Sequence, residues 1–359
     1  MNAQKANLYF VNGPVDFFFM GAAAILTLAY FQLAGPSEKT PEVLTASAFL
    51  LWVVNWPHFS MTCHRLYHSK LNMAQYPFTA FAIPIVILGA VIGCFLAPAV
   101  VAPYFVKLFF IWSPYHFSGQ TVGITLLYAR RAGLPVNRWQ RMALSTFVFG
   151  TFAVSTARAE MVRGGYTYYD IVYPSFGLPE WVATFCDIGM WLGAAVFVLF
   201  CAYSVLIDRR RIPLIVFLLP FTQYLWFVQA IHMPSFQEFV PLFHSLQYIL
   251  IAWVMQLKGK IDAKGLSPSR HYTLTETLRW GGLNFAGGAV LFWFLPIVGS
   301  YSGVSIVFST GIVLAAVQIH HFFVDGVIWK LKNRAVTNPL MANVKDFTGA
   351  HATESAVHA

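Results

Sequence analysis

Charged residues are scarce in this chain. Of its 359 residues only 10% are Asp, Glu, Lys or Arg, whereas 58% are hydrophobic. A soluble domain carries about 25% charged residues, so this composition excludes an ordinary soluble protein and indicates an integral membrane protein. The formal net charge is +9, and the basic residues gather in short loops. We therefore interpret the basic excess as a signal of membrane topology and expect no nucleic-acid partner.

Cysteine is also rare, and several familiar motifs are missing. The chain has 4 cysteines, none in a CxxC spacing, so neither a disulfide framework nor a thiolate metal site is indicated. It lacks the HxxHH clusters of the better-known membrane di-iron hydroxylases and desaturases, and only His64 and His68 have a similar HxxxH spacing. We see no cleavable signal peptide and expect the first apolar segment to direct its own insertion.

What the chain does have is a series of long apolar segments. Each can cross a hydrocarbon layer of about 30 Å, which takes roughly 20 helical residues. The segments lie at 15–35, 43–66, 77–97, 100–129, 139–158, 180–206, 212–233, 238–257, 279–299 and 303–330. They predict an all-α polytopic bundle of about ten transmembrane helices. We expect one transmembrane domain over residues 1–335 and a polar, disordered cytoplasmic tail over 336–359.

Basic residues follow every second apolar segment. They include Arg65 and Lys70, Arg130 and Arg131, Arg209 to Arg211, Lys258 and Lys260, and Lys330 and Lys332. Because cytoplasmic loops carry the excess of Lys and Arg, both termini are predicted to be cytoplasmic, in a bacterial inner membrane. The longest loop on the other side, 159–179, is aromatic and turn-rich, and we expect it along the outer interface.

Histidines occur inside these apolar segments at four loci: His58, His116, His244 and the adjacent pair His320-His321. A polar side chain in hydrocarbon costs several kcal/mol unless it finds a partner. All four loci lie on even-numbered segments, and the helix rise of about 1.5 Å per residue places them in the middle and inner half of the membrane. They predict a shared metal site with one ion, or two ions a few Å apart. Each histidine could instead hydrogen-bond across helices to a carbonyl, Ser or Gln.

Polar residues one turn away share a helix face with these histidines. They are Gln120, Gln247 and Asp325. Asp325 follows His321 by four residues, and a carboxylate at that depth needs a cation, a metal or a proton. We assign Asp325 a catalytic role, either as a ligand or as the acceptor of the second ring N–H of His321. The alternative is that it reaches out to Lys330 or Arg334.

The remaining histidines are not assigned to the metal site. His64 and His68 stand among basic residues at the cytoplasmic surface, where they are expected to face lipid headgroups, and His232 is expected at the outer rim. Imidazole without thiolate suits iron, copper or zinc, and an added carboxylate favours non-heme iron. Fe(II) is therefore the predicted cofactor, and iron in an aromatic membrane cavity suits O₂ chemistry on a lipid-soluble substrate.

Four short patches together resemble a known enzyme family. They are Pro57-His58, His116-Phe117-Ser118-Gly119, His244-Ser245, and His321 with Asp325. In this order they resemble patches of the Brp/Blh-type β-carotene dioxygenases, polytopic membrane enzymes that cleave carotene to retinal. The chain departs from that family where Met61-Thr62 stand in place of an acidic residue, and where Tyr248 or a neighbour replaces a second histidine.

The resemblance implies a membrane-embedded iron oxygenase. Ferrous iron would be held by His58, His116, His244 and either His320 or His321. A carotenoid, another isoprenoid or a lipid would lie against Phe59, Trp112, Tyr115 and Phe117.

Two other classes stay open at this point. One is a heme-binding electron carrier in which two of the histidines are axial ligands. The other is a transporter or accessory subunit in which the histidines serve packing or proton relay, although no convincing internal repeat supports transport. Membrane-protein partners are not identifiable from the sequence; the bilayer and a lipid-soluble substrate are the partners that we expect.

Overall fold

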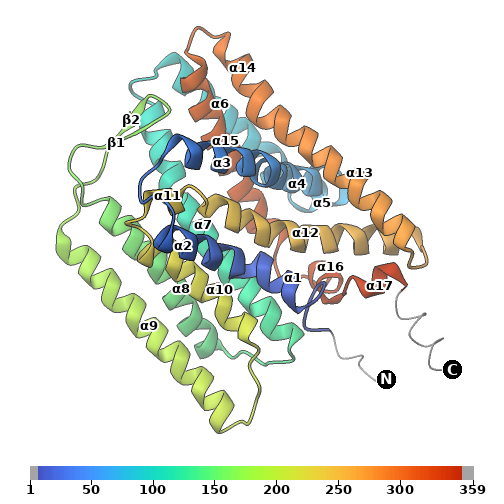
Figure 1. Cartoon of the computed structure of the whole chain (residues 1–359). Helices are drawn as coiled ribbons and strands as arrows, with labels where there is room; N and C mark the ends of the chain where they lie inside the picture. The colour runs from blue at the N-terminus through green and yellow to red at the C-terminus, as the bar shows by residue number, and fades with distance from the viewer. Residues whose placement is uncertain (1–6, 350–359) are drawn as a thin grey trace, which may run out of the picture.

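The computed structural model describes residues 7–349 as a bundle of helices with one small β-hairpin (Figure 1). The helices are α1 (Gly13–Phe17), α2 (Ala23–Leu33), α3 (Pro41–Leu50), α4 (Trp56–Tyr67), α5 (Lys70–Gln75), α6 (Ile83–Leu96), α7 (Ala102–Arg131), α8 (Arg138–Ala159), α9 (Glu180–Leu206), α10 (Leu214–Tyr224), α11 (Pro234–Gln237), α12 (Val240–Lys264), α13 (Arg270–Ala289), α14 (Leu295–Ser300), α15 (Ile306–Ile328), α16 (Arg334–Thr337) and α17 (Lys345–Thr348). The strands are β1 (Tyr166–Tyr168) and β2 (Ile171–Tyr173). The predicted all-α class is confirmed.

Within residues 7–349, six helical stretches are long and apolar enough to cross a membrane. They are Gly13–Leu33, Phe78–Leu96, Glu180–Leu206, Pro234–Lys264, Arg270–Ser300 and Ile306–Ile328. The other apolar segments predicted from the sequence, among them those in α7 and α8, are also helical but are shorter or less apolar. These helices identify the chain as an integral membrane protein.

Short π-helical turns extend several of the helices. Those within residues 7–349 are Phe18–Ala22, Leu51–Asn55, Phe78–Ala82, Leu225–Gln229 and Val290–Phe294. Three of them end just before a proline, namely Pro57, Pro84 or Pro296. Proline has no N–H and its ring crowds the carbonyl four residues earlier, so a wider turn relieves the clash. The turn before Pro57 also sets the direction of α4, which carries His58.

Four helices that carry the predicted histidines meet inside the bundle. α4 packs against α12 and α15, and α15 also packs against α7. In Figure 1 α12 crosses the middle of the molecule, whereas α9 lies along one outer edge. α7 continues through Pro114 without a break, although proline removes one backbone hydrogen bond there. Segments far apart in the sequence are thereby brought together at the histidines.

The β-hairpin lies in the 159–179 loop. Its strands pair antiparallel with Tyr168 opposite Ile171. The two turn residues, Tyr169 and Asp170, have φ values of 47° and 63°, the backbone that a two-residue hairpin turn requires. Strand β2 packs on α7, and the ring of Tyr173 stacks on Phe110 with ring centres 4.9 Å apart. The aromatic residues of this loop are thus anchored on the bundle.

The C-terminal segment is folded beyond residue 336, which corrects the prediction of a disordered tail from that point. It forms α16, a 3₁₀ turn (Pro339–Met341) and α17. Val336, Leu340 and Phe347 are at most 4% exposed because they pack into one of the apolar cores. The N–H of Val344 donates to the carbonyl of Phe10 at 2.8 Å, so the two terminal segments lie side by side. Residues 350–359 of the predicted tail lie outside the described residues.

Candidate metal centre

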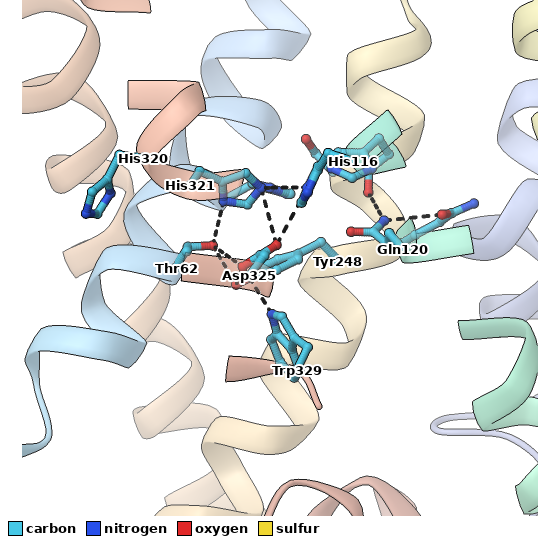
Figure 2. A network of polar contacts seen from close by, with 12 residues as sticks. Thr62, His116, Gln120, Tyr248, His320, His321, Asp325 and Trp329 are labelled. Atoms are coloured by element: carbon cyan, nitrogen blue, oxygen red, sulfur yellow. Dashed lines mark hydrogen bonds and ion pairs between the residues drawn. The ribbon is translucent and has the colours of Figure 1, made fainter. Parts of the chain in front are cut away.

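The structure brings four of the predicted histidines to one point, each from a different helix (Figure 2). Nε2 of His321 lies 3.0 Å from Nε2 of His58 and 3.1 Å from Nε2 of His116. The ring centre of His244 lies 5.2 Å from that of His58 and 5.1 Å from that of His116. His58, His244 and His321 are at most 2% exposed. The four imidazoles therefore lie together in the interior of the bundle.

His320 lies outside this cluster, although it is the neighbour of His321. Its Nε2 is 2.9 Å from the hydroxyl of Tyr67, and its Nδ1 is 3.9 Å from Sγ of Cys63. Figure 2 shows its ring directed away from the other histidines. Successive residues of a helix point about 100° apart, so only one of the adjacent pair can face the centre. Of the two alternatives, the structure places His321 in the cluster.

Three ring nitrogens in the cluster have no hydrogen-bond partner among the described residues. They are Nδ1 of His58 and both Nδ1 and Nε2 of His244. A buried polar atom without a partner costs about 1–3 kcal/mol, so such atoms are rare in folded proteins. His58, His244 and His321 offer ligand atoms that lie within 4.8 Å of one another. A ligand bound between these rings would give one of the two ring nitrogens of His244 a partner.

Asp325 points into the bundle and faces the histidines. Its Oδ2 lies 3.3 Å from Nε2 of His321 and 3.8 Å from Nε2 of His116. These three residues form a second group whose ligand atoms lie within 4.8 Å of one another. The carboxylate is thus directed inward rather than toward Lys330 or Arg334, the alternative that the sequence left open.

The other carboxylate oxygen of Asp325 is held by three donors. Oδ1 accepts hydrogen bonds from Nε1 of Trp329 and Oγ1 of Thr62, both at 3.2 Å, and from the hydroxyl of Tyr248 at 3.4 Å. The Thr62 hydroxyl also lies 2.9 Å from Nδ1 of His321. Such outer partners fix the orientation of metal-binding side chains. The carboxylate and the His321 ring are therefore pre-positioned.

Sequence reasoning did not assign these supporting residues, although a spacing signal was present. Thr62 follows His58 by four residues, Tyr248 follows His244 by four, and Trp329 comes one turn after the carboxylate. Residues four apart lie on the same helix face. A search one turn beyond every buried histidine would have found the first two.

The predicted glutamines have a different place. Nε2 of Gln120 donates to the backbone carbonyl of His244 at 3.0 Å and to Oε1 of Gln247 at 3.3 Å. Nε2 of Gln247 in turn donates to the carbonyl of Met20 at 2.9 Å. These bonds tie α7 and the first helical stretch to α12. The glutamines hold the helices of the centre together rather than reach into it.

The geometry suits a single ion. His321 belongs to both ligand groups, and because Nδ1 is bonded to Thr62, Nε2 is the nitrogen left for a metal. One nitrogen lone pair binds one ion, so the two groups describe one site. With metal–nitrogen bonds of about 2.1 Å, adjacent ligands are about 3.0 Å apart on an octahedron and about 3.4 Å apart on a tetrahedron. The observed separations are 3.0 and 3.1 Å between imidazole nitrogens and 3.3 and 3.8 Å from these nitrogens to the Asp325 carboxylate, so they span both geometries.

A cavity of about 320 Å³, here called the α7–α15 cavity, adjoins the centre. Its wall includes His116, Asp325 and two of the predicted pocket residues, Trp112 and Tyr115. The other two predicted pocket residues lie elsewhere. Phe59 packs on the ring of His321, with ring centres 4.9 Å apart, and Phe117 stacks on His244 at 3.9 Å. These two phenylalanines support the imidazoles instead of lining the cavity.

Other histidines have local roles. The rings of His64 and His68 stack with centres 4.6 Å apart, and Nζ of Lys260 lies 2.9 Å from Nε2 of His68. His232 and His271 are exposed.

Comparison with known proteins gives no relative. The chain matches no known protein family, no curated protein and no solved structure. The resemblance to the Brp/Blh-type dioxygenases therefore stays a prediction that rests on the four sequence patches.

Proposed function

We propose that this chain is a membrane-embedded oxidoreductase, an O₂-dependent oxygenase with one non-heme Fe(II), acting on a lipid-soluble substrate such as a carotenoid, another isoprenoid or a lipid. The observation that carries the proposal is the convergence of His58, His116, His321 and the Asp325 carboxylate beside an apolar cavity. The unpartnered nitrogens of His244 add a fourth imidazole to the centre.

The donor set favours iron over other metals. Two histidines and one carboxylate on adjacent coordination positions are typical of non-heme Fe(II) oxygenases, and His116, His321 and Asp325 provide this set. Bound iron would supply O₂ activation, which no protein side chain can supply.

The residues around the centre would hold and orient the reactants. Thr62 and Trp329 hold the Asp325 carboxylate in one orientation. The Tyr248 hydroxyl bonds to Thr62 at 2.6 Å, and Tyr248 also lines the cavity. Its phenolic oxygen is therefore placed to hold a proton beside the substrate. The aromatic cavity wall would exclude water, which strengthens electrostatic interactions inside the site.

Heme is the second candidate cofactor, but the geometry supports it less. A porphyrin occupies four equatorial positions of its iron and leaves only two axial positions for the protein. Here three imidazole nitrogens and a carboxylate converge on one point. A packing or proton-relay role in a transporter or accessory subunit is also less favoured, because buried histidines used for packing are normally hydrogen-bonded and neither ring nitrogen of His244 has a partner among the described residues.

The test is metal analysis of the protein purified in detergent from its native membrane. We expect about one iron per chain and no Soret band in the visible spectrum. His58→Ala, His116→Ala, His244→Ala and His321→Ala should each lower bound iron about tenfold or more. His320→Ala is the matched control and should retain the metal. Absence of iron, copper and zinc from the native-source protein would overturn the proposal, and a Soret band would favour heme.

We also propose that all ten apolar segments cross a bacterial inner membrane and that both termini are cytoplasmic. Support comes from Arg131, which donates to the carbonyls of Leu8 and Leu340 and so holds both terminal segments at one end of the bundle. A reporter fused after Lys258 should stay inside, and a reporter fused within 159–179 should be exported. The reverse result for either fusion would contradict this topology.

A further inference from the structure

The α7–α15 cavity opens along one side of the bundle. Tyr115 is 49% exposed, and Gly119, Gly326 and Lys330, which also line the cavity, are exposed. Trp112 marks one end of this wall and Lys330 the other. Tyr115 and Gly119 lie near the middle of α7, so this part of the opening faces hydrocarbon when the bundle spans the membrane as proposed. A lipid-soluble molecule could therefore enter the cavity directly from the bilayer.

Glycines keep this opening wide. A Cβ atom added at Gly119, Gly123 or Gly326 would meet no other heavy atom within 4 Å. Glycine inside a helix costs up to about 1 kcal/mol relative to alanine, and here no close helix contact requires it. All three glycines line the cavity, where they contribute backbone and no side chain to its wall. Larger residues there would fill the space beside His116 and Asp325.

The size and shape of the cavity suit one extended chain. Its volume of about 320 Å³ is roughly twice that of the 150 Å³ cavity that holds one benzene. Along α7 the wall runs from Trp112 to Leu127, which the helix rise makes about 22 Å. Spread over that length, a volume of about 320 Å³ leaves room for one hydrocarbon chain. It fits a single-chain molecule that lies parallel to the helices.

A single cation stands at one end of this wall. Lys330 is the only Lys or Arg among the lining residues, and no carboxylate within residues 7–349 forms an ion pair with it. It lies two residues beyond the C-terminal end of α15, the helix that carries His321. One free ammonium at the end of an apolar groove complements one negative charge on an apolar chain.

We propose that the α7–α15 cavity binds a long-chain carboxylate, with its head group at Lys330 and its chain running past Gly326 and Gly123 to the histidine centre. A fatty-acid anion is the simplest such molecule. This assigns the substrate class more narrowly than a lipid-soluble compound. That the bound chain is oxidised rests on the proposed function, whereas its binding does not. The chain then presents a carbon well away from the head group to His116 and Asp325.

Binding is tested with the full-length protein in nanodiscs of phosphatidylcholine. The ligand is 9,10-dibromostearic acid, whose bromines quench nearby tryptophan, and Trp112 and Trp329 lie in the cavity wall. Its methyl ester is the uncharged control ligand. We expect saturable quenching by the acid and weaker binding of the ester. Quenching that does not saturate, or equal affinity for acid and ester, would overturn the proposal.

Two pairs of variants locate the site. Gly123→Leu should lower the binding affinity for both ligands at least tenfold. Gly89→Leu, on α6 with equally open space around it, should change neither affinity. Lys330→Gln should lower the affinity for the acid about three- to fivefold and leave the affinity for the ester unchanged, as the loss of one exposed charge pair predicts. Lys332→Gln is the matched control, because Lys332 does not line the cavity. Unchanged binding in Gly123→Leu, confirmed with Gly119→Leu, would place the ligand elsewhere.

Lipid binding and metal binding can be tested separately. Gly123→Leu should keep its full iron content, and His321→Ala should still bind the brominated acid after losing iron. Loss of lipid binding with intact metal would count for this proposal alone. Intact lipid binding in a protein that never contains metal would overturn the oxygenase and leave a carboxylate-binding membrane protein.

Discussion

Two of the deeply buried polar clusters of the bundle differ in one respect. In the first, the histidine centre, three ring nitrogens have no partner among the described residues. In the second, Asp16 is fully buried and accepts bonds from the N–H groups of Phe10 and Val11 at 2.7 and 3.0 Å. The hydroxyl of Tyr128 donates to the same carboxylate at 2.7 Å. Both clusters place charged or polar groups in an apolar surrounding.

The second cluster is completed by Arg131, which donates to the carbonyls of Leu8, Tyr9, Leu340 and Ala342. We call Asp16, Tyr128 and Arg131 the terminal latch, because they hold the two ends of the chain together. Every polar group of the latch is matched by protein. The comparison indicates that unmet hydrogen bonds, rather than burial, distinguish a binding site from a structural cluster.

The strongest test of this contrast is His321→Ala. This residue belongs to both ligand groups, so its loss should reduce metal affinity by at least about 100-fold, the upper end of what losing a mere supporting partner costs. Chelation should lower the thermal midpoint of the unaltered protein, because a bound ion stabilises the folded state, and should leave His321→Ala unaffected. Metal content and thermal unfolding in detergent are the measurements. An unchanged iron content would remove the residue from the centre.

The reciprocal change is Asp16→Ala in the terminal latch. It leaves two backbone N–H groups and the Tyr128 hydroxyl without their acceptor, and the free energy of unfolding should fall by about 3 kcal/mol. The iron content of the folded fraction should stay the same. Loss of metal together with stability would show that the two clusters are coupled and would contradict the division drawn here.

Asp325→Asn tests whether the carboxylate serves the centre. The amide keeps the shape but removes the charge that faces His116 and His321. We expect metal affinity or turnover to fall roughly 10- to 100-fold. Metal titration of the apo-protein measures the effect. If occupancy and activity stay within about twofold, Asp325 is not part of the site and a histidine-only centre remains.

Trp329→Phe should have a smaller effect. It removes one hydrogen bond of 3.2 Å to Asp325 and keeps the aromatic ring. One such bond contributes about 1 kcal/mol, so metal affinity should fall roughly fivefold. Thr62→Val is a useful companion, because it breaks bonds to both Asp325 and His321 and should cost more. Equal effects of the two changes would argue against this order.

The smallest effect is expected for His320→Phe. Its ring nitrogens face Tyr67 and Cys63 of α4 and point away from the histidine centre. Metal affinity should therefore change less than about twofold. The adjacent His321→Phe should abolish metal binding. The same metal titration measures both variants. Opposite outcomes for these two neighbouring histidines would separate a residue of the metal centre from a residue outside it.

The sequence was informative about the centre because helix periodicity is local. The spacing from His321 to Asp325 predicted one shared face, and the structure has both side chains on it. The same reasoning could not choose between His320 and His321, nor decide whether Asp325 faced inward. Those outcomes depend on how α15 is rotated against α4 and α7, which neighbouring helices decide.

The predicted substrate pocket and the C-terminal segment show the same limit of prediction from local sequence. Phe59 and Phe117 are adjacent to metal-site histidines in the sequence, yet they support rings instead of lining the cavity. Val336 and Leu340 are four residues apart, but Pro339 interrupts any helix between them and Phe347 stands alone in a polar stretch, so the pattern does not predict a contact with the bundle. They become buried only because the N-terminal segment and α12 provide an apolar surface for them.

Composition and periodicity alone determined that this is an all-helical membrane protein with costly histidines inside its apolar segments. They did so because hydrocarbon selects apolar residues and helix geometry repeats every 3.6 residues, and both act over short stretches of chain. Only the tertiary structure decided that His58, His116, His244 and His321 meet, that Asp325 joins them, and that a glycine-walled cavity opens beside them. These features depend on contacts between helices separated by up to 263 residues in the sequence, and no local rule fixes such contacts.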